Sequence, residues 1–279
     1  MSLVDTYLKR LEMVHPATAS VEYLFEIHRR HVERVSWQSI DIFAGRPQPT
    51  AVKTAMKLIA SGRSGYCFHL NGAFAGLLRE LGFVVDWHRA GVQSHGRDPI
   101  IDGFHVGLSA EVEGERWVLD VGLGDMPWEP LPMAPGRYSQ GPFTYEVTAS
   151  QRSKNGWRLV NDSNAAFVGV DVDGAIVPDL QMFEDHHRHL SRDSHSPWVN
   201  LVVVRNREQQ GSNELKGCYF TRRDVSGAHM RIVEDQREWF ELLSDVFYEP
   251  LWDYDGRRRE ALWRAVIRKH EEWVSLGNR

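Results

Sequence analysis

The stretch "GRSGYCFHLNGAF", residues 62–74, places a cysteine where a glycine-containing turn runs into an apolar helix. Apolar residues are spread almost all round the helical wheel that follows: Cys67, Phe68, Leu70, Phe74, Leu77, Leu78 and Leu81. A helix that is hydrophobic on every side is normally buried. We therefore expect a central helix that begins at Cys67 and ends at Gly82.

Further helices are predicted on the N-terminal side of this stretch. Residues at i, i+3, i+4 and i+7 form one apolar stripe on a helix, and Val4, Tyr7, Leu8 and Leu11 have this spacing. A second helix is expected after Ser20 and a third after Thr50, because both are suitable N-cap residues. Gly62 is expected to end the third helix.

From Phe83 onward the pattern changes to short β-type runs separated by glycine, aspartate and proline. These runs occupy residues 83–92, 103–112, 115–123, 143–149, 156–160 and 166–172, with a turn expected at Asp173-Gly174. They predict an antiparallel sheet or barrel. Beyond it we expect a helix at 180–193, strands at 198–205, 217–223 and 229–233, and helices at 236–247 and 257–274. The predicted units are 1–83 (helical), 84–180 (β) and 181–279 (mixed).

Composition restricts the function of the chain. Its 279 residues are 42% hydrophobic and 25% charged, as in an ordinary water-soluble globular protein. The formal net charge of −5 argues against general binding to nucleic acid or to an anionic membrane, because both require a basic surface. Two cysteines do not make a disulfide framework, and the first residues lack the apolar core of a signal peptide. The expected location is the cytoplasm.

Cys67 has two interpretations. A free cysteine is most often a small buried hydrophobe without chemistry. In the first turn of a helix, however, the unpaired N–H groups and the helix dipole favour a negatively charged sulfur. The same N–H groups can stabilise the oxyanion of an acyl-transfer intermediate. Cys218 lies in no such context and keeps the inert interpretation.

A nucleophilic thiolate requires a base and a group that orients the base. His105 lies inside the apolar strand "GFHVGL", and Asp120 follows Val118 and Leu119 in another apolar strand. Taken singly, His105 could be a core histidine and Asp120 a turn residue. A buried carboxylate is costly unless it is paired. A contact between His105 and Asp120 would give both buried groups a partner. The sequence therefore predicts the arrangement thiol, imidazole, carboxylate.

The order Cys67, His105, Asp120 and the sequence around these residues resemble the arylamine N-acetyltransferase family. The matching segments are "RSGYCFHLNGAF" at 63–74, "HVGL" at 105–108, "VLDVGLGD" at 118–125 and "RRHVERVSWQSIDIFAGRP" at 29–47. The resemblance extends to about Met133, and a weaker match follows at residues 191–198.

The resemblance implies an α+β fold with an N-terminal helical bundle, a central antiparallel β-barrel and a C-terminal α/β lid around a cysteine-protease-like catalytic core. It implies ping-pong transfer of acetyl from acetyl-coenzyme A through a Cys67 thioester to an arylamine or hydrazine nitrogen. His105 would move the proton, Asp120 would hold the imidazole, and no metal is expected. Positions that match substrate-binding residues are Trp37, Phe68, Phe104, Leu123, Gly124, Trp128 and Trp198.

Several positions depart from the family pattern. Gln38 replaces a glutamate that would pair with the arginine matching Arg63. Arg63 must therefore either donate a hydrogen bond to the neutral Gln38 or pair with another acid. We expect the bond to Gln38, with both residues acting as structural support for the turn before Cys67. Ser64 replaces a glycine, and His69 replaces a glutamate or glutamine. Leu123 in place of phenylalanine, together with the tryptophans, indicates a reshaped pocket and leaves the acceptor open.

His186 and His189 lie one helical turn apart, but a structural zinc site normally needs four ligands. A polar helix face is the favoured interpretation. The basic amphipathic segment 256–273 is expected to pack on its own domain.

Three classes of function stay open: an acetyl-coenzyme A dependent N-acetyltransferase, an amide synthase that takes an acyl chain from a carrier protein, and a non-catalytic relative that only binds. The complete set of Cys67, His105 and Asp120 disfavours the third class. The expected partners are coenzyme A and a small amine, without nucleic acid or membrane, and a homodimer is one option for assembly.

Overall fold

The computed structural model describes residues 1–277, and the first third of the chain is helical as predicted. The helices are α1 (Leu3–Arg10), α2 (Val21–Arg34), α3 (Ile40–Phe43), α4 (Val52–Ala60) and α5 (Cys67–Glu80). The Ser20 hydroxyl accepts a hydrogen bond from Tyr23 N, which confirms the predicted N-cap of α2. The Thr50 cap is wrong, because α4 begins directly after Ala51 and has no side-chain cap.

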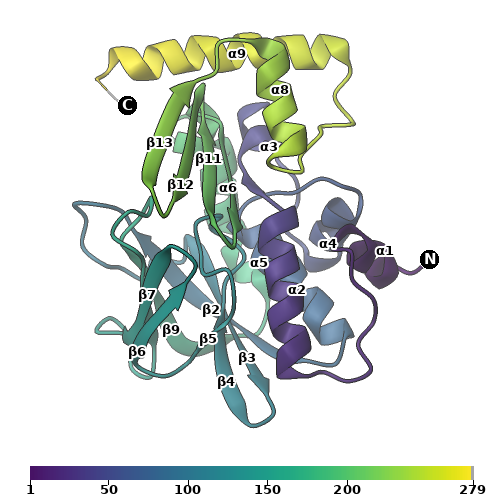
Figure 1. Cartoon of the computed structure of the whole chain (residues 1–279), viewed down its shortest axis with the longest axis vertical. Helices are drawn as coiled ribbons and strands as arrows, with labels where there is room; N and C mark the ends of the chain where they lie inside the picture. Colours follow the sequence, from purple (N-terminus) through teal and green to yellow (C-terminus); the bar gives the residue numbers. More distant parts are fainter. Residues whose placement is uncertain (278–279) are drawn as a thin grey trace.

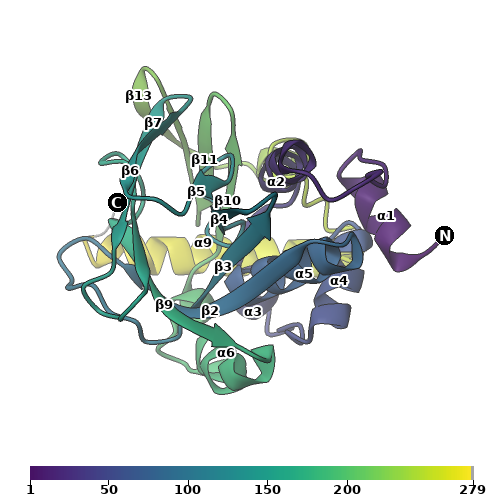
Figure 2. The same cartoon turned by 90° about the horizontal axis from the view of Figure 1, so that it is seen from below.

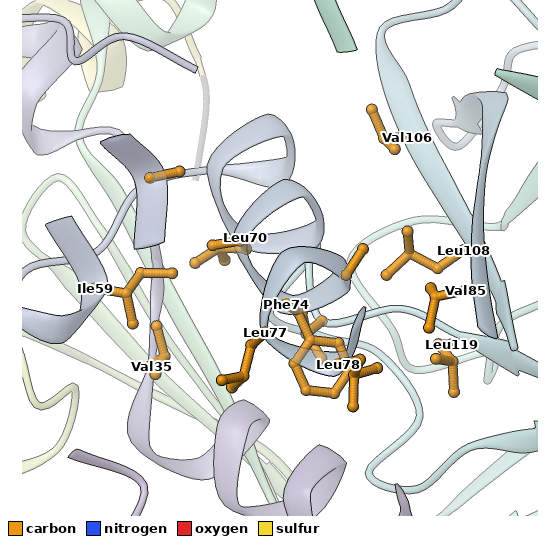
Figure 3. Packing of buried hydrophobic residues seen from close by; sticks show 14 of the residues in the cluster. Val35, Ile59, Leu70, Phe74, Leu77, Leu78, Val85, Val106, Leu108 and Leu119 are labelled. Atoms are coloured by element: carbon orange, nitrogen blue, oxygen red, sulfur yellow. The ribbon is translucent and has the colours of Figure 1, made fainter. Parts of the chain in front are cut away.

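Helix α5 is the centre of the main hydrophobic core, as its all-round apolar pattern predicted. Figure 3 shows its leucine and phenylalanine side chains between Ile59 of α4 and Leu108 of the neighbouring sheet. Gly76 permits the close contact with α4, since a Cβ there would lie 2.5 Å from Val52 Cγ1. The helix ends before Gly82, whose φ of +89° is a left-handed conformation that suits glycine.

Residues 84–177 supply an eight-stranded antiparallel sheet that curves into a nearly closed barrel, which confirms the predicted fold class. Its order is β5-β4-β3-β2-β9-β8-β7-β6. The strands are β2 (Val84–Gln93), β3 (His105–Val112), β4 (Glu115–Leu119), β5 (Leu131–Pro132), β6 (Gly136–Gln140), β7 (Phe143–Ala149), β8 (Trp157–Val160) and β9 (Gly169–Val177). Seen from below, this sheet and the helices α2, α4 and α5 form two adjoining halves (Figure 2).

The turn predicted at Asp173-Gly174 is wrong. Both residues lie within β9, where the register against β2 shifts between His88 and Ala90. The extra residues of β9 form a β-bulge. The composition of this bulge is locally that of a turn, which is why the sequence predicted one.

A second antiparallel sheet has the order β1-β10-β11-β12-β13. Its strands are β1 (Trp37–Gln38), β10 (Val203–Glu208), β11 (Gly211–Lys216), β12 (Tyr219–Asp224) and β13 (Gly227–Ile232). Helices α8 (Gln236–Asp245) and α9 (Gly256–Ser275) complete this part, and α9 crosses the end of the molecule in Figure 1. The segment between the sheets contains the 3-10 turn η1 (Leu180–Phe183) and α6 (Glu184–Arg192), so the predicted helix there is confirmed.

Two details of this second sheet differ from the sequence prediction. The strand expected from Trp198 begins only at Val203, because Pro197–Asn200 form the short helix α7, with Ser196 as its N-cap. Strand β11 was missed, since "GSNELK" shows no apolar alternation. Strand β1 comes from the N-terminal third yet pairs with β10, so the sheet joins the two ends of the chain. Within residues 1–277, no helix is both long enough and apolar enough to cross a membrane.

Candidate active site

Cys67 is the first residue of α5, in the position that the sequence predicted. Tyr66 is the N-cap, and the helical ladder begins with His69 N, which donates to Tyr66 O. The N–H groups before His69 therefore lie outside the ladder at the open end of the helix. The Cys67 side chain is buried, and its Sγ lies 3.7 Å from Phe104 O.

His105 and Asp120 are brought together by neighbouring strands. His105 begins β3, and Asp120 directly follows the last residue of β4. His105 Nε2 lies 2.6 Å from Asp120 Oδ2, and both side chains are buried. The structure thus forms the pair that the two apolar strands predicted.

Asn71, which sequence reasoning missed, holds the Asp120 carboxylate in place. Its Nδ2 donates to Asp120 Oδ1 at 2.9 Å and to Val106 O at 2.6 Å, and its Oδ1 accepts from Val121 N at 2.9 Å. One amide therefore joins α5, β3 and the segment after β4. The available signal was an asparagine among mostly apolar residues of this helix, four residues after Cys67 and so on the same helix face.

The surroundings of His105 favour the protonated imidazole. Complete burial disfavours the charged ring, but the Asp120 carboxylate and the Cys67 sulfur outweigh burial and raise the pKa of His105 to about 10. Nδ1 of His105 is buried without a hydrogen-bond partner among residues 1–277, and the nearby Cys67 sulfur is one of the groups that raise the pKa of the ring. A positively charged imidazole beside a sulfur stabilises the thiolate.

A cavity of about 250 Å³ gives access to Cys67 and His105. Four predicted pocket residues line it, namely Trp37, Phe104, Leu123 and Trp198. The Trp37 and Trp198 rings meet edge to face with centroids 4.9 Å apart. The other lining residues are Tyr66, Val92, Ser94, Asp102, Ala166, Phe167, Leu190 and Arg205. Two wider hollows, of about 490 and 630 Å³, are lined by neither Cys67 nor His105, although the second shares Val92, Ser94 and Asp102 with the cavity.

Three predicted pocket residues do not line the cavity. Phe68 follows Cys67 on the helix and therefore points elsewhere, into the main core. The Trp128 indole faces α2 and donates from Nε1 to Glu33 Oε1 at 2.6 Å. Gly124 lies behind the cavity wall, where a Cβ would come within 2.4 Å of Arg205 Cβ.

The predicted hydrogen bond from Arg63 to Gln38 is wrong. Arg63 is buried, and its guanidinium donates from Nε to Glu249, from one terminal nitrogen to Asp253 at 2.6 Å, and from the other to Asp41 at 3.0 Å. Burial opposes the charge, but these carboxylates raise the pKa of Arg63 above its usual range. Glu249 and Asp253 lie 186 and 190 positions after Arg63, a separation that a local sequence pattern cannot bridge.

The turn before Cys67 is held from two directions. The fully buried Glu249 also accepts a hydrogen bond from the Ser64 hydroxyl. Gln38 donates from Nε2 to Ser64 O at 2.9 Å, and its Oε1 accepts from Ile40 N. The Glu249 carboxylate from the C-terminal part and the Gln38 amide from β1 therefore both hold the turn at Ser64.

The histidines of α6 are used in other contacts. His186 Nε2 lies 3.0 Å from Asp102 O, and His187 Nδ1 lies 2.6 Å from the Tyr66 hydroxyl. No set of three or more His, Cys, Asp or Glu side chains within residues 1–277 is placed to hold a metal ion. Helix α6 thus covers the segments that flank Cys67 and His105.

The family model described as N-acetyltransferase matches residues 20–251, a range that contains Cys67, His105 and Asp120. The chain belongs to the arylamine N-acetyltransferase family. The resemblance noted in the sequence is thereby confirmed.

Curated relatives include bacterial members of the family. The chain is 30% identical to the arylamine N-acetyltransferase of Escherichia coli (strain K12) over 44% of each chain. It is 27% identical to the arylamine N-acetyltransferase / N-hydroxyarylamine O-acetyltransferase of Salmonella typhimurium over 58% of this chain and 55% of that one. The chain therefore matches about half the length of these relatives. Proansamycin X synthase of Amycolatopsis mediterranei is 26% identical over 60% of this chain and 75% of its own.

Solved arylamine N-acetyltransferase structures share the whole fold. The Salmonella typhimurium enzyme superimposes with a TM-score of 0.83 at 22% identity, covering 96% of this chain and 98% of that chain. The Mycobacterium marinum enzyme in complex with CoA gives a TM-score of 0.84 at 20% identity, covering 95% and 98%. At these identities the likeness establishes the fold.

Proposed function

We propose that this member of the arylamine N-acetyltransferase family transfers acetyl from acetyl-coenzyme A to an arylamine or hydrazine nitrogen through a thioester on Cys67. The observation that carries the proposal is the cavity in which Cys67, at the open end of a buried helix, adjoins the charged His105–Asp120 pair. The names of the curated relatives support the acetyl transfer, and the CoA complex of the Mycobacterium marinum enzyme supports the donor.

In the first half-reaction the Cys67 sulfur attacks the carbonyl carbon of the acetyl thioester. A bond from that carbon to Cys67 forms, the bond to the coenzyme A sulfur breaks, and the departing thiolate takes the proton from His105. The N–H groups at the N-terminus of α5 lie where they can bind the transient oxyanion. Asp120, held by Asn71, keeps the imidazole in one orientation.

In the second half-reaction the amine nitrogen attacks the acetyl carbon on Cys67. The new C–N bond forms, the bond to sulfur breaks, and His105 accepts the proton that the amine loses. The thiolate and the protonated imidazole are both restored. The proposed reaction requires no metal, and we propose that the enzyme acts in the cytoplasm. Assembly as a homodimer stays a prediction that light scattering would test.

Intact-protein mass spectrometry after incubation with acetyl-coenzyme A tests the proposal. One acetyl adduct is expected, and aniline should remove it. Cys67→Ala should abolish the adduct. The matched control is Cys218→Ala, because burial raises the pKa of Cys218 to about 11 and leaves it an unreactive thiol. An adduct that survives Cys67→Ala contradicts the mechanism, and no adduct from any donor indicates a binding protein.

A second candidate, an amide synthase, is supported by the match to proansamycin X synthase. Ligand pockets commonly measure about 300–1,000 Å³, so a cavity of about 250 Å³ favours a small acyl group and a small acceptor. Loading of Cys67 from an acyl-carrier thioester, without loading from acetyl-coenzyme A, would favour the synthase instead.

A further inference from the structure

We propose that His187 is a positioning residue for the acyl transfer: it holds the Tyr66 hydroxyl and, through Tyr66, fixes where the Cys67 sulfur is presented. The inference rests on the proposed acyl transfer and adds a residue of α6 to it. The Tyr66 hydroxyl lies 2.6 Å from His187 Nδ1. Tyr66 directly precedes the nucleophile, is the N-cap of α5 and lines the cavity. A shift of this tyrosine therefore moves the first turn of the helix and the sulfur with it.

Tyr66 is buried, so its hydroxyl needs a partner inside the protein. Only 1% of Tyr66 is exposed. Its ring meets Phe68 and Trp37 edge to face, with centroids 5.4 and 6.4 Å away, and stacks on the His187 ring at 5.8 Å. Among residues 1–277, His187 is the hydrogen-bond partner of this hydroxyl and has no competitor. Because a buried hydroxyl without a partner is costly, the observed position of Tyr66 depends on His187.

The hydrogen bond runs from the tyrosine to the histidine. Burial raises the pKa of the Tyr66 hydroxyl well above its ordinary value, so the hydroxyl keeps its proton and donates it. Nδ1 of His187 accepts, which requires a neutral ring with its proton on Nε2. A protonated His187 carries hydrogen on both ring nitrogens, and the Tyr66 hydrogen would then lose its acceptor.

The surroundings keep His187 neutral near pH 7. Burial lowers its pKa; on the same helix, Glu184 opposes this effect and Arg192 adds to it. From α5, the uncharged Tyr66 and the His69 ring face it, the latter edge to face at 5.7 Å. Burial lowers the pKa of His69 to about 4, so His69 is also neutral near pH 7. The bond to Tyr66 is therefore complete near pH 7 and is lost as the pH falls through the lowered pKa of His187.

The neighbouring residue of α6 holds the other side of the cavity. His186 Nε2 donates to Asp102 O at 3.0 Å, and its ring meets Phe104 edge to face with centroids 4.8 Å apart. Phe104 O lies 3.7 Å from Cys67 Sγ, and the next residue is His105. Two consecutive histidines of one helix thus connect the segment before the nucleophile with the segment before its base. Loss of either contact is expected to change how the sulfur faces the imidazole.

Stopped-flow acetylation of Cys67 by p-nitrophenyl acetate tests the proposal, in buffer where urea curves show each variant to be folded. His187→Phe keeps a ring but removes the acceptor, and near pH 7 it should slow acetylation about 3- to 10-fold. His187→Gln, whose amide oxygen can accept, should restore most of the rate. Arg188→Gln is the matched control and should leave the rate unchanged, because Arg188 is exposed and pairs with Asp185 of the same helix.

Two further readouts distinguish positioning from a purely structural role. Tyr66→Phe removes the other half of the same bond, so the double variant with His187→Phe should be no slower than the slower single variant. Between pH 7 and pH 5, His187→Gln should lose less of its rate than wild type, because an amide oxygen accepts at every pH in this range.

The opposite results would overturn the proposal. An unchanged rate in His187→Phe, or single-variant effects that multiply in the double variant, would show that the contact only fills space. The same decline of the rate with pH in wild type and in His187→Gln would also overturn it. Failure of wild-type Cys67 to load from either p-nitrophenyl acetate or acetyl-coenzyme A would instead reject the proposed acyl transfer, and this inference with it.

Discussion

Replacing Gln38 by glutamate should destabilise the protein near neutral pH, although the family pattern has glutamate at this position. Gln38 is 2% exposed, and its Nε2 donates to Ser64 O at 2.9 Å and to Asp41 Oδ2 at 3.4 Å. A carboxylate cannot donate to either oxygen. Arg63 offers little compensation, because Glu249, Asp253 and Asp41 already occupy its guanidinium.

The magnitude follows from these contacts. A buried acceptor that loses its donor costs about 1–3 kcal/mol. A charge placed about 3.4 Å from Asp41 would be repelled by about 5 kcal/mol at an effective dielectric constant of 20. The new carboxyl can avoid this by staying protonated, which costs about 4 kcal/mol near pH 7 for an ordinary glutamate. Since protonation costs less than the repulsion, and a protonated carboxyl can again donate one hydrogen bond, we expect the free energy of unfolding to fall by about 2–4 kcal/mol.

Urea unfolding of Gln38→Glu at pH 7 and pH 5 measures this effect. The loss should shrink at pH 5, because protonation of the new carboxyl becomes easier. Gln38→Leu is the matched control: it removes the same donors without adding a charge, so its loss should not depend on pH. If Gln38→Glu is as stable as wild type at pH 7, the carboxylate pairs with Arg63 as in the family pattern, and the anchoring described above is refuted.

Three further outcomes are expected. Asp120→Asn should slow acetyl loading by orders of magnitude, because the pKa of His105 falls once the carboxylate is gone; near-normal turnover in a stopped-flow loading assay would show that Asp120 is only structural. Iodoacetamide labelling with peptide mapping near pH 8 should modify Cys67 well before Cys218, whose pKa burial raises to about 11; the reverse order would remove the basis for the nucleophile. Burial lowers the pKa of His69 to about 4, so the neutral ring contributes fully to the free energy of unfolding above about pH 6.5, and this contribution is lost as the pH falls toward 4. His69→Gln should make the fall in the free energy of unfolding less steep in denaturation curves, and an unchanged pH dependence would assign the effect to other groups.

The features that the sequence predicted correctly depend on residues that lie close together along the chain. The period of apolar residues identified α5 and its burial, and Cys67 followed as its first residue. His105 and Asp120 lie at the ends of one β-hairpin, β3–β4, so the register of two adjacent strands was enough to pair them. Errors at short range had local causes as well, such as the bulge at Asp173-Gly174 that has the composition of a turn.

By itself, the sequence determined which side chains must be buried and therefore which polar groups need partners: Cys67 at a helix end, and a histidine and an aspartate in apolar strands. It could not determine partners from distant segments. Only the tertiary structure decided that Arg63 pairs with Glu249, 186 positions away, and that β10 carries Arg205 to the cavity beside Trp37. The physical reason is that periodicity and capping report burial and local conformation, whereas the identity of a buried partner depends on how whole elements pack in space.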